Sequence, residues 1–198
     1  MALINFAQRQ IMTKIVYYGP GMSGKTSNLE YIYSKVPEAQ RKKMVSVATE
    51  LERTIFFDFF PMDVGTIAGL KVIFQLYTVP GQVYYSSTRR LVLDGADGII
   101  FVADSQAFRL QANIESFRDL YENLASYKVD IRKIPIIIQY NKRDLDTALP
   151  VSELEEKLNY RYLPSFEATA HTGEGVFETL KAVTTRVLDN LRKEFDRK

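Results

Sequence analysis

One eight-residue stretch constrains this chain more than any other feature of its sequence: positions 19–26 read GPGMSGKT. The stretch follows an apolar run, Lys14–Tyr18, and precedes a segment with helical spacing that begins at Ser27. The pattern G-x-x-x-x-G-K-[ST] in this context is typical of a loop whose backbone N–H groups surround phosphate oxygens at a helix N-terminus. A chance glycine-rich turn is the alternative. The strand before and the helix after favour a phosphate-binding loop.

Two residues at the end of this loop carry its expected chemistry. We predict that Lys25 reaches the β- and γ-phosphates and assists catalysis, and that the Thr26 hydroxyl binds Mg²⁺. The residues expected to bind the nucleotide here are Gly19, Gly21, Met22, Ser23, Gly24, Lys25, Thr26 and Ser27.

The composition predicts a single domain over residues 1–198. The chain has 198 residues, 46% of them hydrophobic, which is enough for one sizeable core. A net charge of +2 gives no basic field for nucleic acid, and the lack of cysteine excludes disulfides and thiolate metal sites. The sequence has no apolar run of the roughly 18 residues that a membrane span needs, and no myristoylation or prenylation site. We expect a cytoplasmic protein without a membrane anchor of its own.

Short apolar runs alternate with segments of helical spacing, the pattern of an α/β fold with a mostly parallel sheet and helices on both faces. The expected sheet has six strands and an extra N-terminal strand. Strands are predicted near 4–6, 14–18, 54–60, 71–77, 98–103, 134–139 and 163–166, and helices near 25–35, 110–124 and 176–191.

A second motif indicates which base is bound. Asn141-Lys142-Arg143-Asp144 directly follows an apolar strand. A carboxylate at Asp144 can accept the N1 and N2 hydrogens of guanine, a donor pair that adenine lacks, so the contact would discriminate between the bases. The Asn141 amide is expected to hold the loop and the base edge, while the Lys142 stem covers the ring. A charged surface turn is the alternative, and the position after a strand favours base recognition.

A third segment agrees with this interpretation. Thr169, Ala170 and His171 follow the last predicted strand, and the Ala170 N–H is expected to donate to guanine O6. The order of the three motifs resembles the small Ras-like GTPases across nearly the whole chain, although that family usually has a Ser-Ala-Lys triplet here. The resemblance implies GTP and GDP as ligands, with Mg²⁺. For His171, a loop residue beside the base is favoured over a general base.

The hydrolysis motif departs from the Ras-like pattern. The segment 77–82 reads YTVPGQ, where the family usually has D-x-x-G-Q. Gly81 fits the γ-phosphate sensor and Gln82 the residue that orients the attacking water. Thr78 replaces the aspartate, so it brings no charge to the metal, although its hydroxyl could contact a magnesium-bound water. We hypothesise that Asp58, inside an apolar strand, supplies that charge, and a solvent-facing carboxylate on an edge strand is equally favoured.

Arg53 and Thr54, at the start of that strand, are candidates for contacts to GTP in the triphosphate state. The resemblance makes Thr54 the switch threonine that binds magnesium and the γ-phosphate. Arg53 beside it could neutralise transition-state charge, an effect of roughly 10³–10⁵ in rate. Position alone leaves a solvated loop arginine as an equal alternative.

Five segments together resemble the bacterial MglA family, and Thr78 is part of that resemblance. They are residues 15–21, 52–54, 56–59, 77–82 and 139–145. The resemblance implies a nucleotide-dependent switch of cell polarity and of gliding or twitching motility. It implies that Arg53 is an arginine finger in cis, and that a Roadblock-type, MglB-like activator positions the switch residues. It also suggests downstream effectors, and recruitment to a cell pole by partners.

Aromatic residues beside the switch segments form a candidate docking surface for this activator. Phe56–Phe60 are predicted to lie on an edge strand, and Tyr84 and Tyr85 add aromatic area. Arg89 and Arg90 in the following helix could join this surface, but a solvated helix face is favoured for them.

Two other functions remain open. The missing magnesium aspartate would suit a scaffold that binds GTP but barely hydrolyses it, and Gln82 and Arg53 argue against it. A phosphate-loop kinase of a small metabolite would need an arginine-bearing lid and would leave residues 141–144 without a role.

Overall fold

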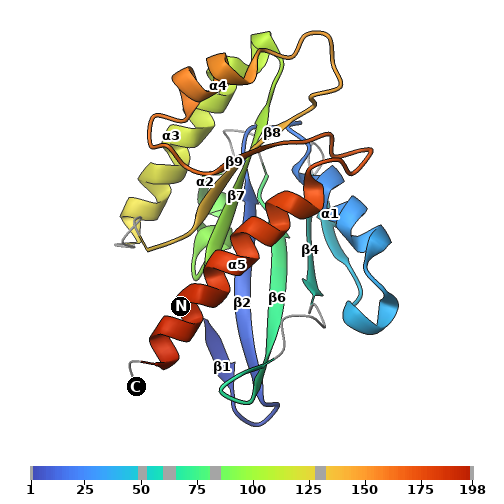
Figure 1. The fold of residues 1–198 in the computed structure, drawn as a ribbon, viewed down its shortest axis with the longest axis vertical. Coiled ribbons are helices and arrows are strands. Elements are labelled where there is room, and N and C mark those ends of the chain that lie inside the picture. Colours follow the sequence, from blue (N-terminus) through green and yellow to red (C-terminus); the bar gives the residue numbers. More distant parts are fainter. Residues whose placement is uncertain (1, 49–52, 60–65, 81–85, 128–132, 197–198) are drawn as a thin grey trace.

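The computed structural model describes residues 2–48, 53–59, 66–80, 86–127 and 133–196. Within these ranges, nine strands form one sheet in the order β3-β4-β6-β2-β7-β8-β9, with β1 on β2 and β5 on β6 (Figure 1). The strands are β1 (Leu3–Asn5), β2 (Gln10–Tyr18), β3 (Val45–Ala48), β4 (Arg53–Phe59), β5 (Thr66–Ile67), β6 (Leu70–Thr78), β7 (Gly98–Asp104), β8 (Ile136–Asn141) and β9 (Ser165–Glu167). From β6 across to β9 all neighbours are parallel, whereas β1, β3, β4 and β5 pair antiparallel.

Helices cover both faces of the sheet, as the alternating pattern predicts. They are α1 (Lys25–Lys35), α2 (Ser86–Leu93), α3 (Leu110–Ser126), α4 (Val151–Leu158) and α5 (Val176–Phe195). Helix α5 crosses one face beside α1, and α3 and α4 pack on the other (Figure 1). No helix within the described ranges combines the length and the apolar character needed to cross a bilayer.

Strand β2 separates the two hydrophobic cores of the molecule. Its side chains alternate between the faces, as in any strand. Ile15 and Tyr17 join the core under α1 and α5, while Val16 and Tyr18 join the core under α3 and α4. Because β2 is central and fully buried near its end, the loop that follows it has a fixed starting point.

The predicted strands and helices are present, and the structure adds elements that the sequence analysis did not predict. These are the strands β3 and β5 and the helix α4. Strand β3 pairs with β4, from Ala48 opposite Arg53 to Val45 opposite Phe56. The prediction that Phe56–Phe60 lie on an edge strand is wrong at Phe56, which pairs with Val45 of β3. Strand β3 pairs only with Arg53–Phe56, so Phe57–Phe59 have no strand partner on that side among the described residues.

The parallel strands β2, β7, β8 and β9 bring the predicted motifs to one edge of the sheet. Ligands of open α/β sheets bind outside the carboxyl ends of such strands. Strand β2 ends at Tyr18, before the phosphate loop, β8 ends at Asn141, and β9 ends at Glu167.

Candidate nucleotide-binding site

The phosphate loop requires glycine at both of its ends. Gly19 has φ 141°, and a Cβ there would lie 2.2 Å from the Val102 carbonyl oxygen of β7. Gly24 has φ 99°, and a Cβ there would lie 2.1 Å from Asn141 Nδ2. Side chains at either position would meet both a strained backbone and an occupied space. The loop is thus packed directly on β7 and on the base-binding segment.

The start of α1 has the properties of an anion site. Gly24 is its N-cap residue and makes no side-chain capping bond, and the first turn has no acidic residue. The Lys25 side chain is buried, and its Nζ donates to the carbonyls of Gly19 (2.9 Å) and Pro20 (2.6 Å). Ser23 Oγ is buried with no hydrogen-bond partner among the described residues. A helix N-terminus with an ammonium group and an unpaired hydroxyl fits a phosphate group.

The Asn141 side chain joins the three predicted motifs. Its Nδ2 donates to the Ser23 carbonyl at 2.7 Å, and its Oδ1 accepts from the Ala170 N–H at 2.9 Å. The residue is buried at the end of β8. The Ala170 N–H is therefore bonded to Asn141 here, and its bond to guanine O6 stays a prediction.

The remaining base-site residues lie around Asn141. Asp144 and His171 are exposed, and His171 Nδ1 lies 4.0 Å from Asp144 Oδ2. This arrangement agrees with His171 as a loop residue beside the base. Thr169 is buried, and its N–H donates to the Glu174 carbonyl. Asp144 is exposed to solvent in this loop, and its contact to guanine stays a prediction.

Thr78, for which a contact to a magnesium-bound water is predicted, lies at a strand end, as the sequence analysis expects. It is the buried last residue of β6, and it pairs with Tyr17, two residues before the phosphate loop. Strand β4 pairs with β6 only as far as Phe56 opposite Tyr77, so Arg53 and Thr54 extend past this pairing toward the same edge of the sheet. The side chains of Arg53 and Thr54 lie outside the described part of the chain.

The register of β4 bears on the Asp58 hypothesis. Asp58 pairs with Gln75, three residues before Thr78 on β6. At about 3.4 Å per residue, its backbone is roughly 10 Å from the level of Thr78. A metal role for Asp58 stays a hypothesis, but this register places its backbone away from Thr78 at the end of β6. Five further residues with predicted roles lie outside the described part of the chain, and their roles stay predictions: Phe60, Gly81, Gln82, Tyr84 and Tyr85.

The two arginines of α2 differ in exposure: Arg90 is exposed, as predicted for a solvated helix face, whereas Arg89 is not. Arg89 is buried, and its Nε lies 3.0 Å from Asp119 Oδ2 on α3. Arg90 Nε donates to Asn123 Oδ1 at 2.9 Å. The Tyr18 hydroxyl donates to Asp119 and accepts from Asn123, and burial together with the bond to Asp119 raises the pKa of Tyr18. The solvated-face interpretation of Arg89 is wrong, because the side chain fixes α2 to α3.

Sequence reasoning also missed an acidic residue in the site. Asp104 ends β7 and is 1% exposed, and its Oδ2 lies 2.7 Å from Lys142 Nζ. The signal was present in the sequence, since a carboxylate directly after six apolar or small residues needs a buried partner.

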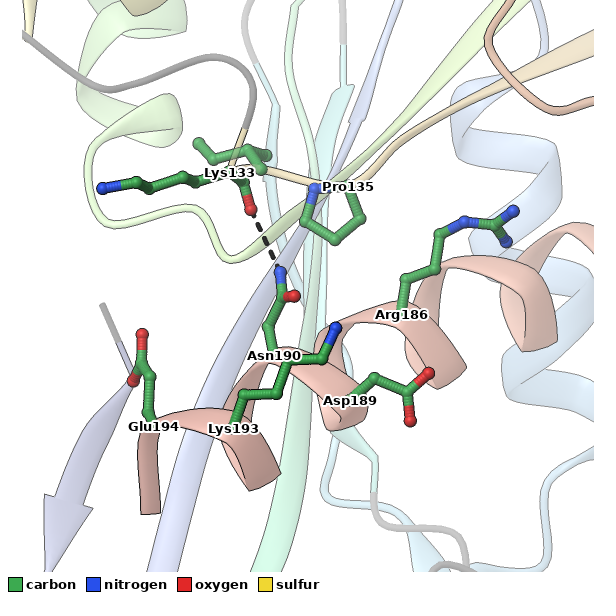
Figure 2. A pocket seen from close by; sticks show the side chains of 8 residues that line it. Lys133, Pro135, Arg186, Asp189, Asn190, Lys193 and Glu194 are labelled. Atoms are coloured by element: carbon green, nitrogen blue, oxygen red, sulfur yellow. Dashed lines mark hydrogen bonds between the residues drawn. The ribbon is translucent and has the colours of Figure 1, made fainter. Parts of the chain in front are cut away.

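A hollow beside α5 lies away from the phosphate loop. It has a volume of about 520 Å³ and lies between α5 and the segment before β8, with Lys133, Arg186 and Lys193 among its lining residues (Figure 2). Asn190 donates to the Lys133 carbonyl across it. Pro135 directly precedes β8, so the hollow is at the opposite edge of the sheet from the phosphate loop.

A family model described as the ADP-ribosylation factor family matches residues 3–187. The chain belongs to this family of small GTPases. Its members bind guanine nucleotides with Mg²⁺ and hydrolyse GTP. The chain is 53% identical over 193 residues to the mutual gliding-motility protein MglA of Myxococcus xanthus (strain DK1622), covering 98% of this chain and 99% of that protein. It is 26% identical over 187 residues to ADP-ribosylation factor-like protein 6 of Caenorhabditis elegans, covering 90% of each chain. These matches agree with the resemblance to Ras-like and MglA-type GTPases found in the sequence.

Proposed function

We propose that this GTPase is a molecular switch that controls bacterial cell polarity and gliding or twitching motility. The observation that carries nucleotide binding is the Asn141 side chain, which bonds to the phosphate loop and to the Ala170 segment at once. The motility role is supported by the 53% identity to a gliding-motility protein over almost the whole of both chains.

The chain offers a consistent set of groups for GTP and Mg²⁺. Lys25 and the start of α1 would hold the β- and γ-phosphates, and Asp144 would read guanine. The hydroxyl of Thr26 would bind the metal, joined by Thr54 in the triphosphate state and by Thr78 through a water. The bound Mg²⁺ would neutralise charge between the β- and γ-phosphates.

Hydrolysis is assigned to residues on the β4 and β6 side of the phosphate loop. Gln82 would orient the attacking water, Gly81 would sense the γ-phosphate, and Arg53 would neutralise the charge that develops on the transferred group. The position of Arg53 at the start of β4, past the pairing with β6, supports this assignment.

A Roadblock-type, MglB-like activator is the proposed partner. It would dock on Phe56–Phe60, Tyr84, Tyr85 and the adjoining segments, and would align Arg53 and Gln82 without inserting an arginine of its own. Recruitment to a cell pole and the choice of downstream effectors would then follow from partner binding.

Turnover of GTP with and without the activator tests the proposal. We expect slow hydrolysis by the protein alone and an acceleration of about 10²-fold or more when a Roadblock-type dimer is added. The competing function is a GTP-binding scaffold, which the threonine at position 78 favours. A protein that retains GTP but does not hydrolyse it under either condition would be that scaffold.

A further inference from the structure

The Asp104 carboxylate is held in a fixed place at the end of β7. Asn113 of α3 bonds to both backbone groups of this residue: the Asp104 N–H donates to Asn113 Oδ1 at 2.9 Å, and Asn113 Nδ2 donates to the Asp104 carbonyl at 2.8 Å. Asn113 is itself fully buried. Asp104 also pairs with Asn141 across β7 and β8, so its side chain starts next to the base-binding loop.

Two cations converge on this buried carboxylate. Lys142 Nζ lies 2.7 Å and Arg109 Nε lies 3.7 Å from Asp104 Oδ2. The backbone and side-chain N–H groups of Gln106 bond to Oδ1 at 3.2 and 3.1 Å. Asp104 is 1% exposed while both cations are about a quarter exposed. A buried charge requires such partners, so the carboxylate fixes the positions of both cations.

Arg109 continues the connection to the phosphate loop. Its Nη2 donates to the Gly21 carbonyl at 2.6 Å, 88 residues earlier in the sequence. A continuous chain of contacts therefore runs from Lys142 through Asp104 and Arg109 to Gly21. We call this chain the Asp104 bridge.

At one end of the Asp104 bridge, and next to the other end, a non-glycine residue has a positive φ in the left-handed region of backbone conformation. Lys142 has φ 66°, and Met22, directly after Gly21, has φ 63°. This conformation is disfavoured for such residues and persists where the surroundings hold it. The Asp104 bridge contacts both turns, at Lys142 itself and at Gly21 next to Met22.

We propose that Asp104 and Arg109 are positioning residues that tie the guanine-binding loop to the phosphate loop and thereby slow the release of nucleotide. Neither residue needs to touch the nucleotide: Asp104 orients Lys142, and Arg109 orients the backbone at Gly21. This inference rests on the proposed binding of a guanine nucleotide to these two loops.

The test is the dissociation rate of a fluorescent GDP analogue from the full chain, in excess unlabelled GDP. Arg109→Met keeps the stem and removes the guanidinium, and Asp104→Asn removes the charge. Each is expected to accelerate dissociation by roughly 10-fold or more, the effect of losing a charged hydrogen bond. The double variant should be little faster than the faster single variant, because both act through one chain of contacts. Arg109→Lys, which keeps a cation near Asp104, should restore most of the slow release.

The matched control is Arg186→Met. Arg186 also donates to a backbone carbonyl, that of Ala182, but lies at the opposite edge of the sheet (Figure 2). It should leave the dissociation rate unchanged. Thermal unfolding of each GDP-loaded variant gives the second readout.

Two results would overturn the proposal that the Asp104 bridge slows nucleotide release. One is an unchanged dissociation rate in both single variants. The other is a lower unfolding temperature with an unchanged rate, which would make the cluster merely structural. Failure of the unmodified chain to bind GDP would instead contradict the proposed function.

Discussion

The base side and the hydrolysis side of the site are built differently. On the base side, described side chains connect the predicted segments directly: Asn141 bonds to Ser23 and Ala170, and Lys142 reaches the phosphate loop through Asp104 and Arg109. On the proposed hydrolysis side, the described tie is the ion pair by which Arg89 joins α2 to α3.

This difference suggests a division of labour. Parallel strands β7 and β8 end beside the phosphate loop, so the chain's own bonds hold the segment proposed for base recognition. The residues proposed for hydrolysis are at the start of β4, an antiparallel strand, and in the sequence after β6. We therefore expect base-side substitutions to alter nucleotide retention, and hydrolysis-side substitutions to alter turnover while retention stays unchanged.

Arg53→Ala should give the largest effect. Loss of the guanidinium is expected to lower activator-stimulated hydrolysis by about 10³–10⁵-fold, because transition-state charge is left uncompensated. GDP and GTP affinities should not change. Single-turnover hydrolysis with the activator measures the rate, and Arg186→Ala serves as a control for removing an arginine. Full stimulated activity in Arg53→Ala would remove Arg53 from the hydrolysis side.

Gly24→Ala should disrupt the base side. The new Cβ would meet Asn141 Nδ2, and residue 24 would keep a disfavoured φ. Loss of both Asn141 bonds together with this strain predicts nucleotide affinity lower by more than about 100-fold. Gly69→Ala is the matched control, since Gly69 has φ 73° and no atom within 4 Å of a Cβ. Titration calorimetry with GDP compares them, and equal affinities would show that the loop tolerates displacement of Asn141.

Tyr18→Phe tests the bonds between β2 and α3 at the two α3 residues that also hold the arginines of α2. It removes the hydroxyl that bonds to Asp119 and Asn123, and should lower the free energy of unfolding by about 2 kcal/mol. Tyr17→Phe is the neighbouring control. The Tyr17 hydroxyl is buried without a hydrogen-bond partner among the described residues, so its removal should change stability by less than about 0.5 kcal/mol.

Urea unfolding of the GDP-loaded proteins measures this difference. Equal losses of stability in the two variants would mean that the bonds from Tyr18 of β2 to Asp119 and Asn123 of α3 contribute nothing specific to stability.

Asp58→Asn should have the smallest effect. The Asp58 backbone is roughly 10 Å from the level of Thr78, which is about one Debye length. Salt would therefore screen most of the attraction between its carboxylate and a magnesium ion beside Thr78. The magnesium dependence of nucleotide binding should change by less than about 2-fold. A clear loss of magnesium affinity would instead support Asp58 as the missing charge beside Thr78.

Motifs at the ends of parallel strands were predictable from the sequence. The segments at 19–26 and 141–144 follow the buried ends of β2 and β8, and the segment at 169–171 follows the short strand β9, so local pattern and topology agree on their position. The fold class followed from the same alternation of apolar runs and helical segments.

The sequence was less informative where long-range pairing decides. Strand β3 has only four residues and pairs with Arg53–Phe56, so only the first part of the expected edge strand lies inside the sheet. Arg89 reads as a surface residue until Asp119 of α3 is placed beside it, 30 positions later. Asp104 has a clear local signal, but its partner Lys142 lies 38 residues away.

Base selectivity is the most direct test of the central claim that this site binds a guanine nucleotide. Binding of GDP, ADP and XDP should be measured for the unmodified chain and for Asp144→Asn. Guanine presents two donors to the carboxylate, whereas xanthine presents one donor and one acceptor, which match an asparagine amide. We predict that the unmodified chain prefers GDP over ADP by about 10³-fold or more, and that Asp144→Asn prefers XDP. Equal binding of ADP and GDP, or an unaltered preference in Asp144→Asn, would contradict the account.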